Sequence, residues 1–420
     1  MNILVIGGGG REHAVIWKLK QSANCGKVYC IPGNAGISEL AECHPEIGAC
    51  DLDKILDFVR GHADIGLTVV APDDPLALGL VNLLEENGFR AFGPRKEAAI
   101  IEASKAYSKE LMKKYGIPTA GYESFTDYAA AKAYVETASL PVVLKADGLA
   151  LGKGVLICET REAALEGLSD IMEKKVFGRS GDCVVVEEFM TGQEVSVLAF
   201  CDGEHIVPMV SCQDHKRAFT GDKGLNTGGM GTFSPSRHYT PEIAAWCMEH
   251  IYLPTVEALK RENRTFKGIV FFGLMLTKDG PKVLEYNARF GDPETQSVLP
   301  RLKGDLLEIF EACIDGTLDR VKIEWEDNCT LCVVAASGGY PQSYQKGLPI
   351  EIGALEEGIT VFHAGTKFDD AGRLVTNGGR VLGVCAGGGT IEEAREKVYR
   401  NIDNIRFQGM FYRTDIGIKK

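Results

Sequence analysis

Residues 285–296 carry the side chains with the clearest chemistry, in the order Glu-Tyr-Asn-Ala-Arg-Phe-Gly-Asp-Pro-Glu-Thr-Gln. Glu285 and Asn287 stand two residues apart at the end of a predicted strand, so both side chains point to one face. A carboxylate and an amide oxygen on one face suit Mg²⁺, which proteins usually hold together with nucleotide phosphates. Arg289 adds a planar cation for the same phosphates, and Asp292 adds a carboxylate that can hold an amine. The motif therefore predicts a nucleotide-phosphate site with a divalent metal.

The strands that must position this motif are visible in the residues before it. An apolar run at 268–276 and a shorter one at 283–284 flank a polar turn at 279–280, which predicts a hairpin that leads into the motif. A glutamate and an asparagine at a strand end are by themselves typical of a solvated edge. The sequence Arg-Phe-Gly-Asp-Pro-Glu, which follows closely, favours a functional site instead.

The chain has the composition of an ordinary globular protein. Its 420 residues exceed what one hydrophobic core normally serves, so we expect roughly two to four domains. The net charge of -12 argues against nucleic acid as a partner. No apolar run approaches the ~20 residues of a membrane span, and the N-terminus lacks the basic start of a signal peptide. We therefore expect a cytoplasmic protein without a membrane partner.

The cysteines predict reduced thiols. There are 13 of them, an odd number scattered through apolar runs, which does not suit a disulfide framework. Cys329 and Cys332 have the spacing of a metal-binding pair, but they lie in or beside the strand-like run 330–336 with no second pair nearby. Core packing is therefore favoured over metal or redox chemistry at this pair.

The first hundred residues alternate short apolar strands with amphipathic helices, which is typical of a parallel α/β sheet. Strands are expected at 3–6, 28–31 and 67–71, and helices from about residue 12 and near 52–60.

Four glycines at 7–10 connect the first strand to the first helix, so the backbone of Gly8 and Gly9 can approach a phosphate at the helix N-terminus. A mononucleotide or sugar-phosphate loop is the favoured interpretation, and a purely structural turn is the next. An NAD loop is the weakest, because Glu12 stands where the dinucleotide fingerprint requires a third glycine.

The middle of the chain combines a lysine-bearing strand with a glycine-rich flap. The strand 141–145 ends at Lys145, and residues 146–154 form a turn before the next strand at 155–158. Such a flap can fold its backbone over phosphates. It is not a Walker A loop, because the residue order fails and a strand follows instead of a helix.

Two further strands, at 183–189 and 192–198, have acidic residues at their join. Glu187 and Glu188 are neighbours in the first strand, so their side chains point to opposite faces and only one faces a cleft. We expect the other to be structural or solvated.

The last segment, 326–420, is predicted to be a small α+β domain, with three strands separated by glycine turns and a helix at 392–401. The other predicted domains are an N-terminal α/β domain at 1–103 and a central domain at 104–325.

The order and separation of these features resemble the ATP-grasp superfamily: Lys145 with its flap, the acidic stretch 187–194, and Glu285 with Asn287. More narrowly, the chain is similar to the phosphoribosylamine-glycine ligases, also called glycinamide ribonucleotide synthetases. That resemblance rests on Asp-His-Lys-Arg at 214–217, Gly-Asp-Lys-Gly-Leu-Asn-Thr-Gly-Gly-Met-Gly at 221–231 and Arg-Phe-Gly-Asp-Pro-Glu at 289–294, and it covers essentially the whole chain.

The resemblance implies a fold and a reaction. The central domain would be an ATP-grasp domain with a flexible lid at about 120–190. ATP, with Mg²⁺ or Mn²⁺, would phosphorylate the carboxylate of glycine, and the amine of 5-phosphoribosylamine would attack the acyl phosphate. The partners implied are these small molecules, and no obligate protein partner is evident.

The resemblance also implies roles for individual residues. Those implied for ATP are the phosphate-facing Lys105 and Lys145, the lid residues Gly148, Gly152, Lys153 and Gly154, the adenine-reading Glu187, Glu188 and Phe189, and the ribose ligand Glu194. Glu285 and Asn287 would hold the metal, Arg289 would stabilise the transferring phosphoryl group, and Asp292 would hold the glycine ammonium. Those implied for 5-phosphoribosylamine are Gly8, Gly9, Asp214, Lys216, Asn226, Gly228, Gly229, Met230 and Gly231.

The chain departs from the usual family text at 71–75, Ala-Pro-Asp-Asp-Pro, where Gly-Pro-Glu is expected. The change keeps an acid, so we expect activity to survive, with a less secure role for Asp73. His215 and His363 are expected to have structural or hydrogen-bonding roles. The cluster 215–217 is interpreted as an anion pocket, with a solvated loop as the alternative.

Three other functions stay open at this point. A different ATP-dependent carboxylate-amine ligase or carboxylase would keep the nucleotide residues and change those at 214–231. A nicotinamide-dependent dehydrogenase would use the N-terminal glycine loop and leave Glu285 and Asn287 without a role. A non-enzymatic nucleotide sensor is the least favoured, because it would leave many reactive side chains idle.

Overall fold

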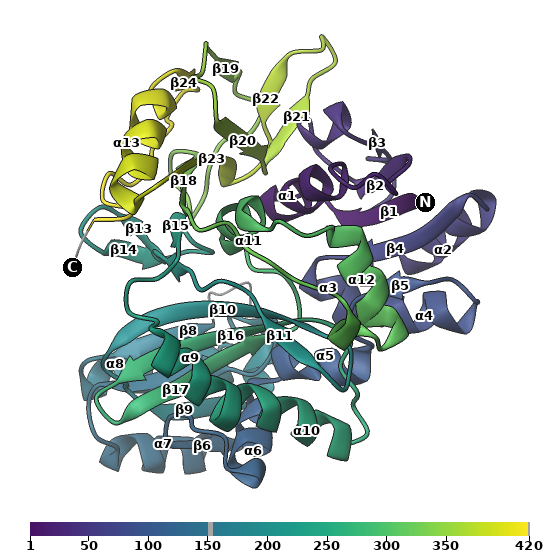
Figure 1. Ribbon diagram of the computed structural model, residues 1–420. Helices are drawn as coiled ribbons and strands as arrows, with labels where there is room; N and C mark the ends of the chain where they lie inside the picture. Colours follow the sequence, from purple (N-terminus) through teal and green to yellow (C-terminus); the bar gives the residue numbers. More distant parts are fainter. Residues whose placement is uncertain (150–153, 419–420) are drawn as a thin grey trace.

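The computed structural model describes residues 1–149 and 154–418. The predicted site residues Gly152 and Lys153 lie outside the described residues. Figure 1 shows three parts: the N-terminal sheet on the right, the central sheets below, and the C-terminal sheet with its long helix above. Among the described residues, none of the helices has the length and apolar character that crossing a membrane requires.

The N-terminal part is a five-stranded sheet in the order β3-β2-β1-β4-β5, with every pair parallel. Its strands are β1 (Asn2–Gly7), β2 (Val28–Pro32), β3 (Glu42–Cys43), β4 (Ile65–Val70) and β5 (Ala91–Phe92). The helices of this segment are α1 (Gly10–Leu19), α2 (Leu52–Gly61), α3 (Asp73–Leu78), α4 (Leu80–Glu86) and α5 (Lys96–Ala103). The predicted parallel α/β sheet is confirmed.

Both faces of this sheet are covered, which explains why its strands are apolar without alternation. Leu4 and Ile6 face a core shared with α2 and α4, whereas Ile3 and Val5 face a core shared with α1. The second core also contains α12 (Leu306–Asp315), a helix from a distant part of the chain. The N-terminal sheet is therefore completed by a later segment.

The central part contains an antiparallel sheet in the order β11-β10-β16-β17. Its strands are β10 (Gln193–Cys201), β11 (Ile206–Pro208), β16 (Gly268–Thr277) and β17 (Gly280–Asn287), and the nearby helices are α6 (Lys105–Tyr115), α9 (Pro241–Cys247) and α10 (Leu253–Arg261). The predicted hairpin is the pair β16 and β17. Glu285 lies opposite Gly273, where an added Cβ would lie only 3.1 Å from the Glu285 Cγ, so the glycine leaves room for that side chain.

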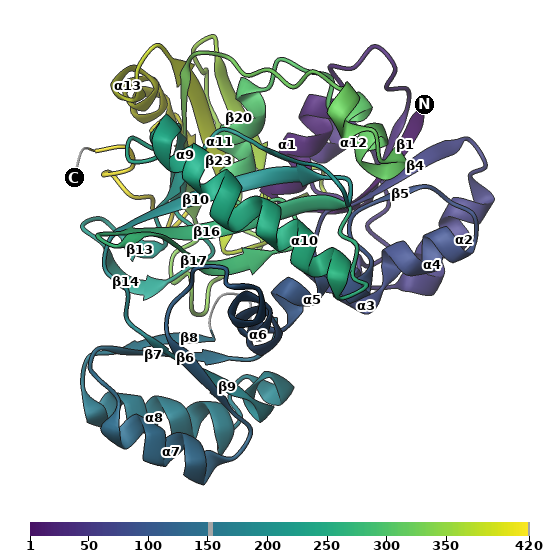
Figure 2. The same ribbon diagram turned by 60° about the horizontal axis from the view of Figure 1, so that its bottom comes forward.

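A second central sheet, in the order β6-β9-β7-β8, has its own core and projects from the rest of the molecule (Figure 2). Its strands are β6 (Tyr122–Phe125), β7 (Val142–Ala146), β8 (Val155–Cys158) and β9 (Val184–Glu188), and α7 (Tyr128–Thr137) and α8 (Arg161–Met172) pack on it. The glycine-rich flap connects β7 to β8. These strands and helices form a separate small layer, and they lie within the segment predicted to be the lid.

The C-terminal sheet has the order β12-β15-β18-β23-β20. Its strands are β12 (Gln213–Asp214), β15 (Gly231–Ser234), β18 (Cys329–Ala336), β20 (Ile359–His363) and β23 (Arg380–Gly388), and α13 (Ile391–Ile402) packs on it. Two short pairs flank it: β21 (Thr366–Phe368) with β22 (Leu374–Thr376), and β19 (Glu351–Ile352) with β24 (Ile405–Arg406). Strands β12 and β15 come from the segment that the sequence places in the central part. Cys332 is fully buried in β18, opposite Cys385.

Candidate active site

The structure places Glu285 and Asn287 at the end of β17 and surrounds the carboxylate with lysines. Lys216 Nζ lies 3.4 Å from Glu285 Oε1. The Lys216 ammonium, together with Lys145 and Lys105, lowers the pKa of Glu285 to about 2, although burial opposes this shift. Glu285 is therefore ionised at neutral pH and available as an oxygen ligand.

Lys145 on β7 and Glu187 on β9 form a buried ion pair beside this carboxylate. Their Nζ and Oε1 atoms are 2.9 Å apart, and Lys145 also donates to the Leu284 carbonyl at 3.0 Å. A second lysine, Lys109, lies 3.0 Å from the other oxygen of Glu187, and burial lowers its pKa to about 8. Lys145, Glu187, Glu285 and Asn287 are called the strand cluster below, because regular strands hold all four.

The side chains of the two adjacent glutamates of β9 point to opposite faces, as the geometry of a strand requires. Glu187 is buried against the two lysines, whereas Glu188 is exposed and accepts hydrogen bonds from the Gly121 N–H at 2.9 Å and Lys282 at 3.4 Å. Phe189, directly after them, is also exposed.

The start of the flap is tied to the first turn of α6. Lys105 Nζ donates to the Gly148 carbonyl at 2.8 Å, and Asp147 accepts from the Ala106 N–H at 3.0 Å. Ser104 caps the same helix. The flap therefore leaves β7 close to Lys105, and Gly154 at its other end adjoins β8.

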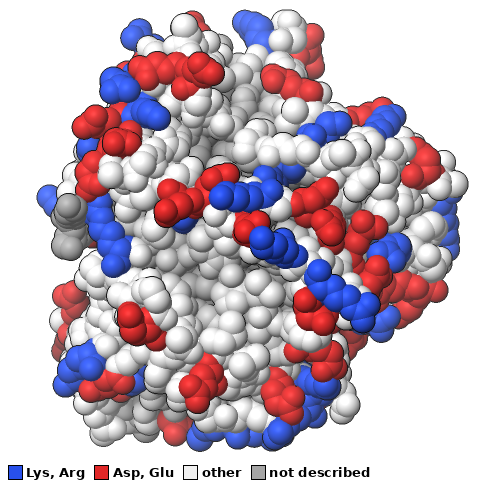
Figure 3. Space-filling model, in the orientation of Figure 1, with Lys and Arg blue, Asp and Glu red and all other residues white. Residues whose placement is uncertain are grey.

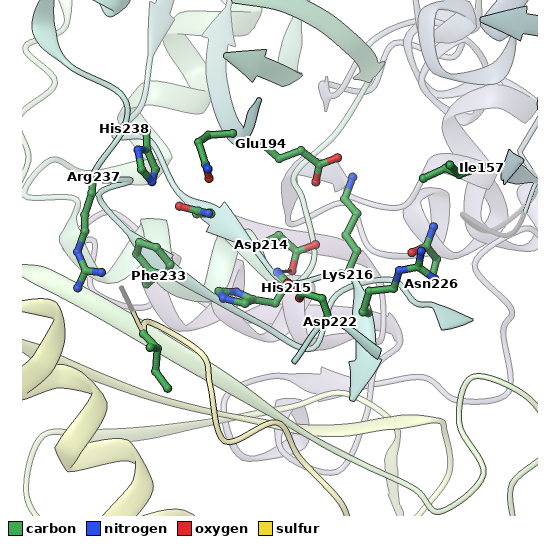
Figure 4. Close-up of a pocket in the computed structure, with 14 residues that line it drawn as sticks. Ile157, Glu194, Asp214, His215, Lys216, Asp222, Asn226, Phe233, Arg237 and His238 are labelled. Carbon is green, nitrogen blue, oxygen red and sulfur yellow. Dashed lines mark hydrogen bonds between the residues drawn. The ribbon is translucent and has the colours of Figure 1, made fainter. Parts of the chain in front are cut away.

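A cavity of about 320 Å³ opens beside Lys216 (Figure 4). Its lining includes Glu194, Asp214, Lys216 and Asn226, and Lys216 reaches toward Glu194. The carboxylates of Glu194, Glu285 and Asp214 raise the pKa of Lys216 above its ordinary value. This ammonium is permanently charged and faces a space large enough for part of a nucleotide.

A second group of charges surrounds Asp292, on the loop after β17. Arg380 Nη1 lies 3.5 Å from Asp292 Oδ1, and Gln296 donates to that same oxygen at 2.9 Å. Burial opposes ionisation of Asp292, but Arg380 and Arg11 hold its pKa below the usual value. Arg11, Asp292, Gln296 and Arg380 are called the docking cluster below, because they come from three parts of the chain.

The N-terminal glycine loop lies against the docking cluster. An added Cβ on Gly9 would lie 3.4 Å from Asp292 Oδ2, and one on Gly8 would lie 2.5 Å from the Gly33 carbonyl. Glu12 accepts the Gly9 N–H at 2.6 Å, and Arg11 donates to the Phe290 carbonyl at 3.0 Å. The Glu12 carboxylate thus occupies a helix N-terminus where a dinucleotide would place its pyrophosphate, which argues against the NAD interpretation.

The glycines after the hairpin β13 (Arg217–Phe219) and β14 (Lys223–Asn226) approach the same region. An added Cβ on Gly229 would lie 2.6 Å from Asp214 Oδ1, and the φ of +113° also requires glycine. Arg380 donates to the carbonyls of Gly228 at 2.8 Å and Gly229 at 3.4 Å. Asp214 and the glycine loop are therefore in contact.

Two of the predicted substrate residues have structural partners. The Met230 side chain is fully buried, its N–H donates to the His215 carbonyl, and its carbonyl accepts from Val334. Gly231 belongs to β15, and its carbonyl accepts from the His215 N–H.

Arg289 has a partner that the sequence did not reveal. Its Nη2 lies 2.7 Å from Glu102 Oε1, while Glu102 Oε2 accepts the Ala288 N–H at 2.7 Å. Arg289 also donates to Asn287 Oδ1 at 3.2 Å. Glu102 is buried within the apolar positions of α5, and a single acid on an apolar helix face is the one signal that marks it.

Lys109, Arg11 and Arg380 were likewise not predicted as site residues. Arg380 follows two glycines at 378–379, a local pattern that does not mark a site residue by itself. Asp73, at the departure from the family text, lies near Arg289 and Arg11, which hold its pKa below the usual value despite burial. The acid retained there still faces two arginines.

The oxygen donors of the strand cluster fit a magnesium ion. Glu285 is ionised, and Asn287 adds a neutral amide oxygen. Among residues 1–149 and 154–418, no group of three or more His, Cys, Asp or Glu side chains is arranged to hold a metal. A metal at this site would therefore share its coordination with phosphates and water, as Mg²⁺ commonly does.

Three family models of phosphoribosylglycinamide synthetase match the chain: the N domain at 1–102, the ATP-grasp (A) domain at 103–295 and the C domain at 330–419. The phosphoribosylamine-glycine ligase of Halalkalibacterium halodurans is 50% identical over 100% of this chain and 97% of that protein. The ligase of Salmonella typhimurium is 45% identical over 99% of this chain and 98% of that protein.

Solved structures agree on the fold. The crystal structure of the Thermotoga maritima phosphoribosylamine-glycine ligase has a TM-score of 0.83 and 35% identity, and covers 99% of this chain and 100% of that one. The biotin carboxylase domain of the Hydrogenobacter thermophilus 2-oxoglutarate carboxylase, solved with MgADP, has a TM-score of 0.77 at 16% identity, covering 98% and 91% of the two chains. That second likeness concerns the fold alone. The chain belongs to the phosphoribosylamine-glycine ligase family, a family of ATP-dependent ligases with an ATP-grasp domain.

Proposed function

We propose that the strand cluster and the docking cluster together ligate glycine to 5-phosphoribosylamine, with ATP as the energy source and a glycyl phosphate as the intermediate. The family's reaction is the ATP-dependent ligation of glycine to phosphoribosylamine in purine biosynthesis. One observation carries the assignment to these residues. Glu285, which has Lys216, Lys145 and Lys105 around it, is joined by the short segment 286–291 to a half-buried Asp292 that two arginines keep ionised.

The strand cluster is proposed to hold ATP. Lys105, Lys145 and Lys216 would neutralise the phosphates, and the flap ends Gly148 and Gly154 would cover them. A Mg²⁺ or Mn²⁺ ion held by Glu285 and Asn287 would reduce the charge repulsion between the phosphates and the attacking carboxylate. The residues proposed for adenine and ribose are Glu187, Glu188, Phe189 and Glu194.

The docking cluster is proposed to hold glycine. Asp292 would bind the ammonium group, which leaves the glycine carboxylate free to attack the γ-phosphorus while ADP leaves. Arg289, fixed by Glu102, would stabilise the charge on the transferring phosphoryl group. Little acid-base chemistry by side chains is needed in this step.

The second step joins the two substrates. The amine of 5-phosphoribosylamine would attack the acyl carbon of glycyl phosphate, and inorganic phosphate would leave. We propose that 5-phosphoribosylamine lies between two groups of residues. One is the N-terminal loop of Gly8 and Gly9, and the other consists of Asp214, Lys216, Asn226 and 228–231. Closure of the flap would keep water from the acyl phosphate.

We also propose domain boundaries at 103/104 and 325/326, with the lid at about 120–190. All 13 cysteines are free thiols, which suits the reducing cytoplasm that we propose as the compartment. Acidic and basic side chains are interspersed on the face in Figure 3, and we propose no nucleic acid, membrane or obligate protein partner.

Phosphate release from MgATP tests the proposal directly. Freshly made 5-phosphoribosylamine is supplied with glycine, without it, or with alanine in its place. We expect release only with both 5-phosphoribosylamine and glycine. Release that proceeds without 5-phosphoribosylamine would instead identify a different ATP-grasp ligase.

A further inference from the structure

The C-terminal segment contains an arginine with no solvent exposure. Arg413 is 0% exposed, and arginine is almost never fully buried unless its charge is paired. Its Nε and Nη2 donate to the two oxygens of Asp415 at 2.8 and 2.7 Å. Nη2 also donates to Asp222 at 2.8 Å, and Nη1 donates to the Arg217 carbonyl at 3.0 Å. One guanidinium thus connects the C-terminal segment to the hairpin of β13 and β14.

The same segment also forms hydrogen bonds with the turn of that hairpin in which a backbone N–H is the donor. Asp415 accepts the Gly221 N–H at 2.9 Å, and the Thr414 N–H donates to Thr220 Oγ1 at 3.1 Å. We call residues 413–415 the clasp. It holds the three turn residues 220–222.

The clasp is itself anchored to α13. The Tyr399 hydroxyl donates to the Arg413 carbonyl at 2.6 Å and accepts the Ile416 N–H at 3.2 Å. Ile416 is fully buried in the C-terminal core. The hairpin turn is therefore connected, through residues 413–416, to α13 and to the buried core of the C-terminal part.

The hairpin needs such support because it buries little apolar surface. Its large apolar residues Phe219 and Leu225 are 50% and 53% exposed. At its base, the Thr227 N–H donates to the Lys216 carbonyl at 2.8 Å. Lys216 and Asn226 leave the two ends of the hairpin and line the 320 Å³ cavity, and Lys216 reaches Glu285. Any displacement of the hairpin therefore moves both side chains.

We propose that Arg413 is a positioning residue for the substrate cavity: by clasping the turn 220–222 it holds Lys216 and Asn226 in their places opposite Glu194 and Glu285. This inference rests on the proposed function, because the proposed function assigns the residues of this cavity to ATP and 5-phosphoribosylamine. Arg413 is absent from the residues that line the cavity, whereas its partners Arg217 and Asp222 are among them. Lysine cannot replace Arg413, because only the planar guanidinium can donate to both oxygens of Asp415 and also to Asp222.

The test uses three variants of the full chain and one control. R413M removes the guanidinium, and R413K keeps the positive charge without the planar guanidinium. T220V removes the Thr220 hydroxyl, which accepts the Thr414 N–H at 3.1 Å and hydrogen-bonds with the Thr414 hydroxyl at 3.2 Å. The control is R400M, which breaks the exposed pair of Arg400 and Glu356 at 3.2 Å elsewhere on α13. Phosphate release gives kcat and KM for each substrate, and calorimetry gives the affinity for MgATP.

We expect R413M and R413K to raise the KM for ATP or 5-phosphoribosylamine about 10-fold, as loss of a supporting residue commonly does. We expect T220V to raise this KM about 3-fold, because it loses only the hydrogen bonds of one exposed hydroxyl. The control R400M should have the same KM values as the parent. Trypsin should also cleave after Lys223, inside the hairpin, faster than in the parent. The increase should be largest in R413M and R413K, smaller in T220V and absent in R400M.

Equal KM values in T220V, R413K and R400M would overturn the proposal, and so would faster hairpin cleavage without any change in KM. If R413M fails to fold, T220V and R413K decide the question. If the parent itself shows no glycine-dependent turnover, the proposed reaction is wrong. The affinity for MgATP then still decides the positioning role: weaker binding in T220V than in R400M supports it, and equal binding overturns it.

Discussion

The strand cluster and the docking cluster differ in how they are built. Lys145 and Glu187 lie on the paired strands β7 and β9 of one sheet, and Glu285 lies on β17 of the other central sheet, so regular strands carry all three. The docking cluster depends on contacts between distant segments: Arg11 and its acceptor, the Phe290 carbonyl, are 279 positions apart in the sequence. One half of the site is thus carried by regular strands, whereas the other half depends on loops and helix ends from three distant parts of the chain.

This difference has an energetic side. In the strand cluster, lysines and carboxylates neutralise one another within a few ångströms, and removing one partner leaves a buried charge unpaired. In the docking cluster, Arg380 also fixes backbone, at the carbonyls of Gly228 and Asp292. Substitutions in the strand cluster should therefore damage ATP chemistry as a whole, and those in the docking cluster should affect single substrates.

Replacing Glu285 with glutamine tests the strand cluster and has the largest expected effect. Turnover of ATP should fall on the order of 10³-fold, because the metal loses its charged ligand among the lysines. The measurement is phosphate release over a range of Mg²⁺ concentrations. Glu204→Gln, which removes an exposed pair with Lys260, serves as the control. Recovery of full activity at high Mg²⁺ would limit the role of Glu285 to metal affinity.

Replacing Asp292 with asparagine tests the docking cluster. The KM for glycine should rise on the order of 100-fold, since a charged hydrogen bond to the ammonium is lost. The affinity for MgATP, measured by calorimetry, should stay that of the parent. Unchanged glycine kinetics would show that another group holds the amine, and weakened MgATP binding would erase the distinction between the clusters.

Glu102→Gln probes the link between the clusters. Glu102 holds the side chain of Arg289, which stands between Asn287 and Asp292 in the sequence. We expect kcat to fall about 10-fold with little change in either KM, since the ion pair that orients Arg289 is lost. Glu97→Gln on the same helix is the matched control. A change in the glycine KM alone would place Arg289 within the docking cluster.

The smallest expected effect is a pH dependence of docking. His13 accepts the His363 N–H at 2.9 Å between the N-terminal and C-terminal parts, and burial, with a further contribution from His363, lowers its pKa from 6.5 to about 3. The unfolded state therefore binds more protons below pH 6.5. The free energy of unfolding should fall with decreasing pH, by at most about 1.4 kcal/mol per pH unit from this group.

Urea unfolding between pH 7 and 5 measures this slope. His13→Asn should show a shallower dependence than the parent. His363 and His215, whose pKa values burial also lowers to about 4, contribute to the slope that remains. His250→Asn, at an exposed histidine, should keep the parent slope. Identical slopes in the parent and in His13→Asn would mean that His13 is already accessible to protons in the folded state.

Local patterns were sufficient for much of the fold. Apolar runs predicted β1, β2, β4 and the hairpin of β16 and β17, and amphipathic spacing predicted α13. The alternation along a strand also predicted that Glu187 and Glu188 point apart. It did not say which one is buried, because period two defines two faces without assigning either to the core.

The sequence by itself determined the three-part α/β organisation, the ligase family, and the placement of Glu285 and Asn287 on one face of a strand. Only the tertiary structure decided that Glu102 holds Arg289, that Arg380 reaches Asp292, and that β12 and β15 join the C-terminal sheet. The reason is physical. Hydrophobic periodicity and residue spacing act over a few residues, whereas these contacts depend on which buried faces pack together, and that is settled by the shape and charge of the whole chain.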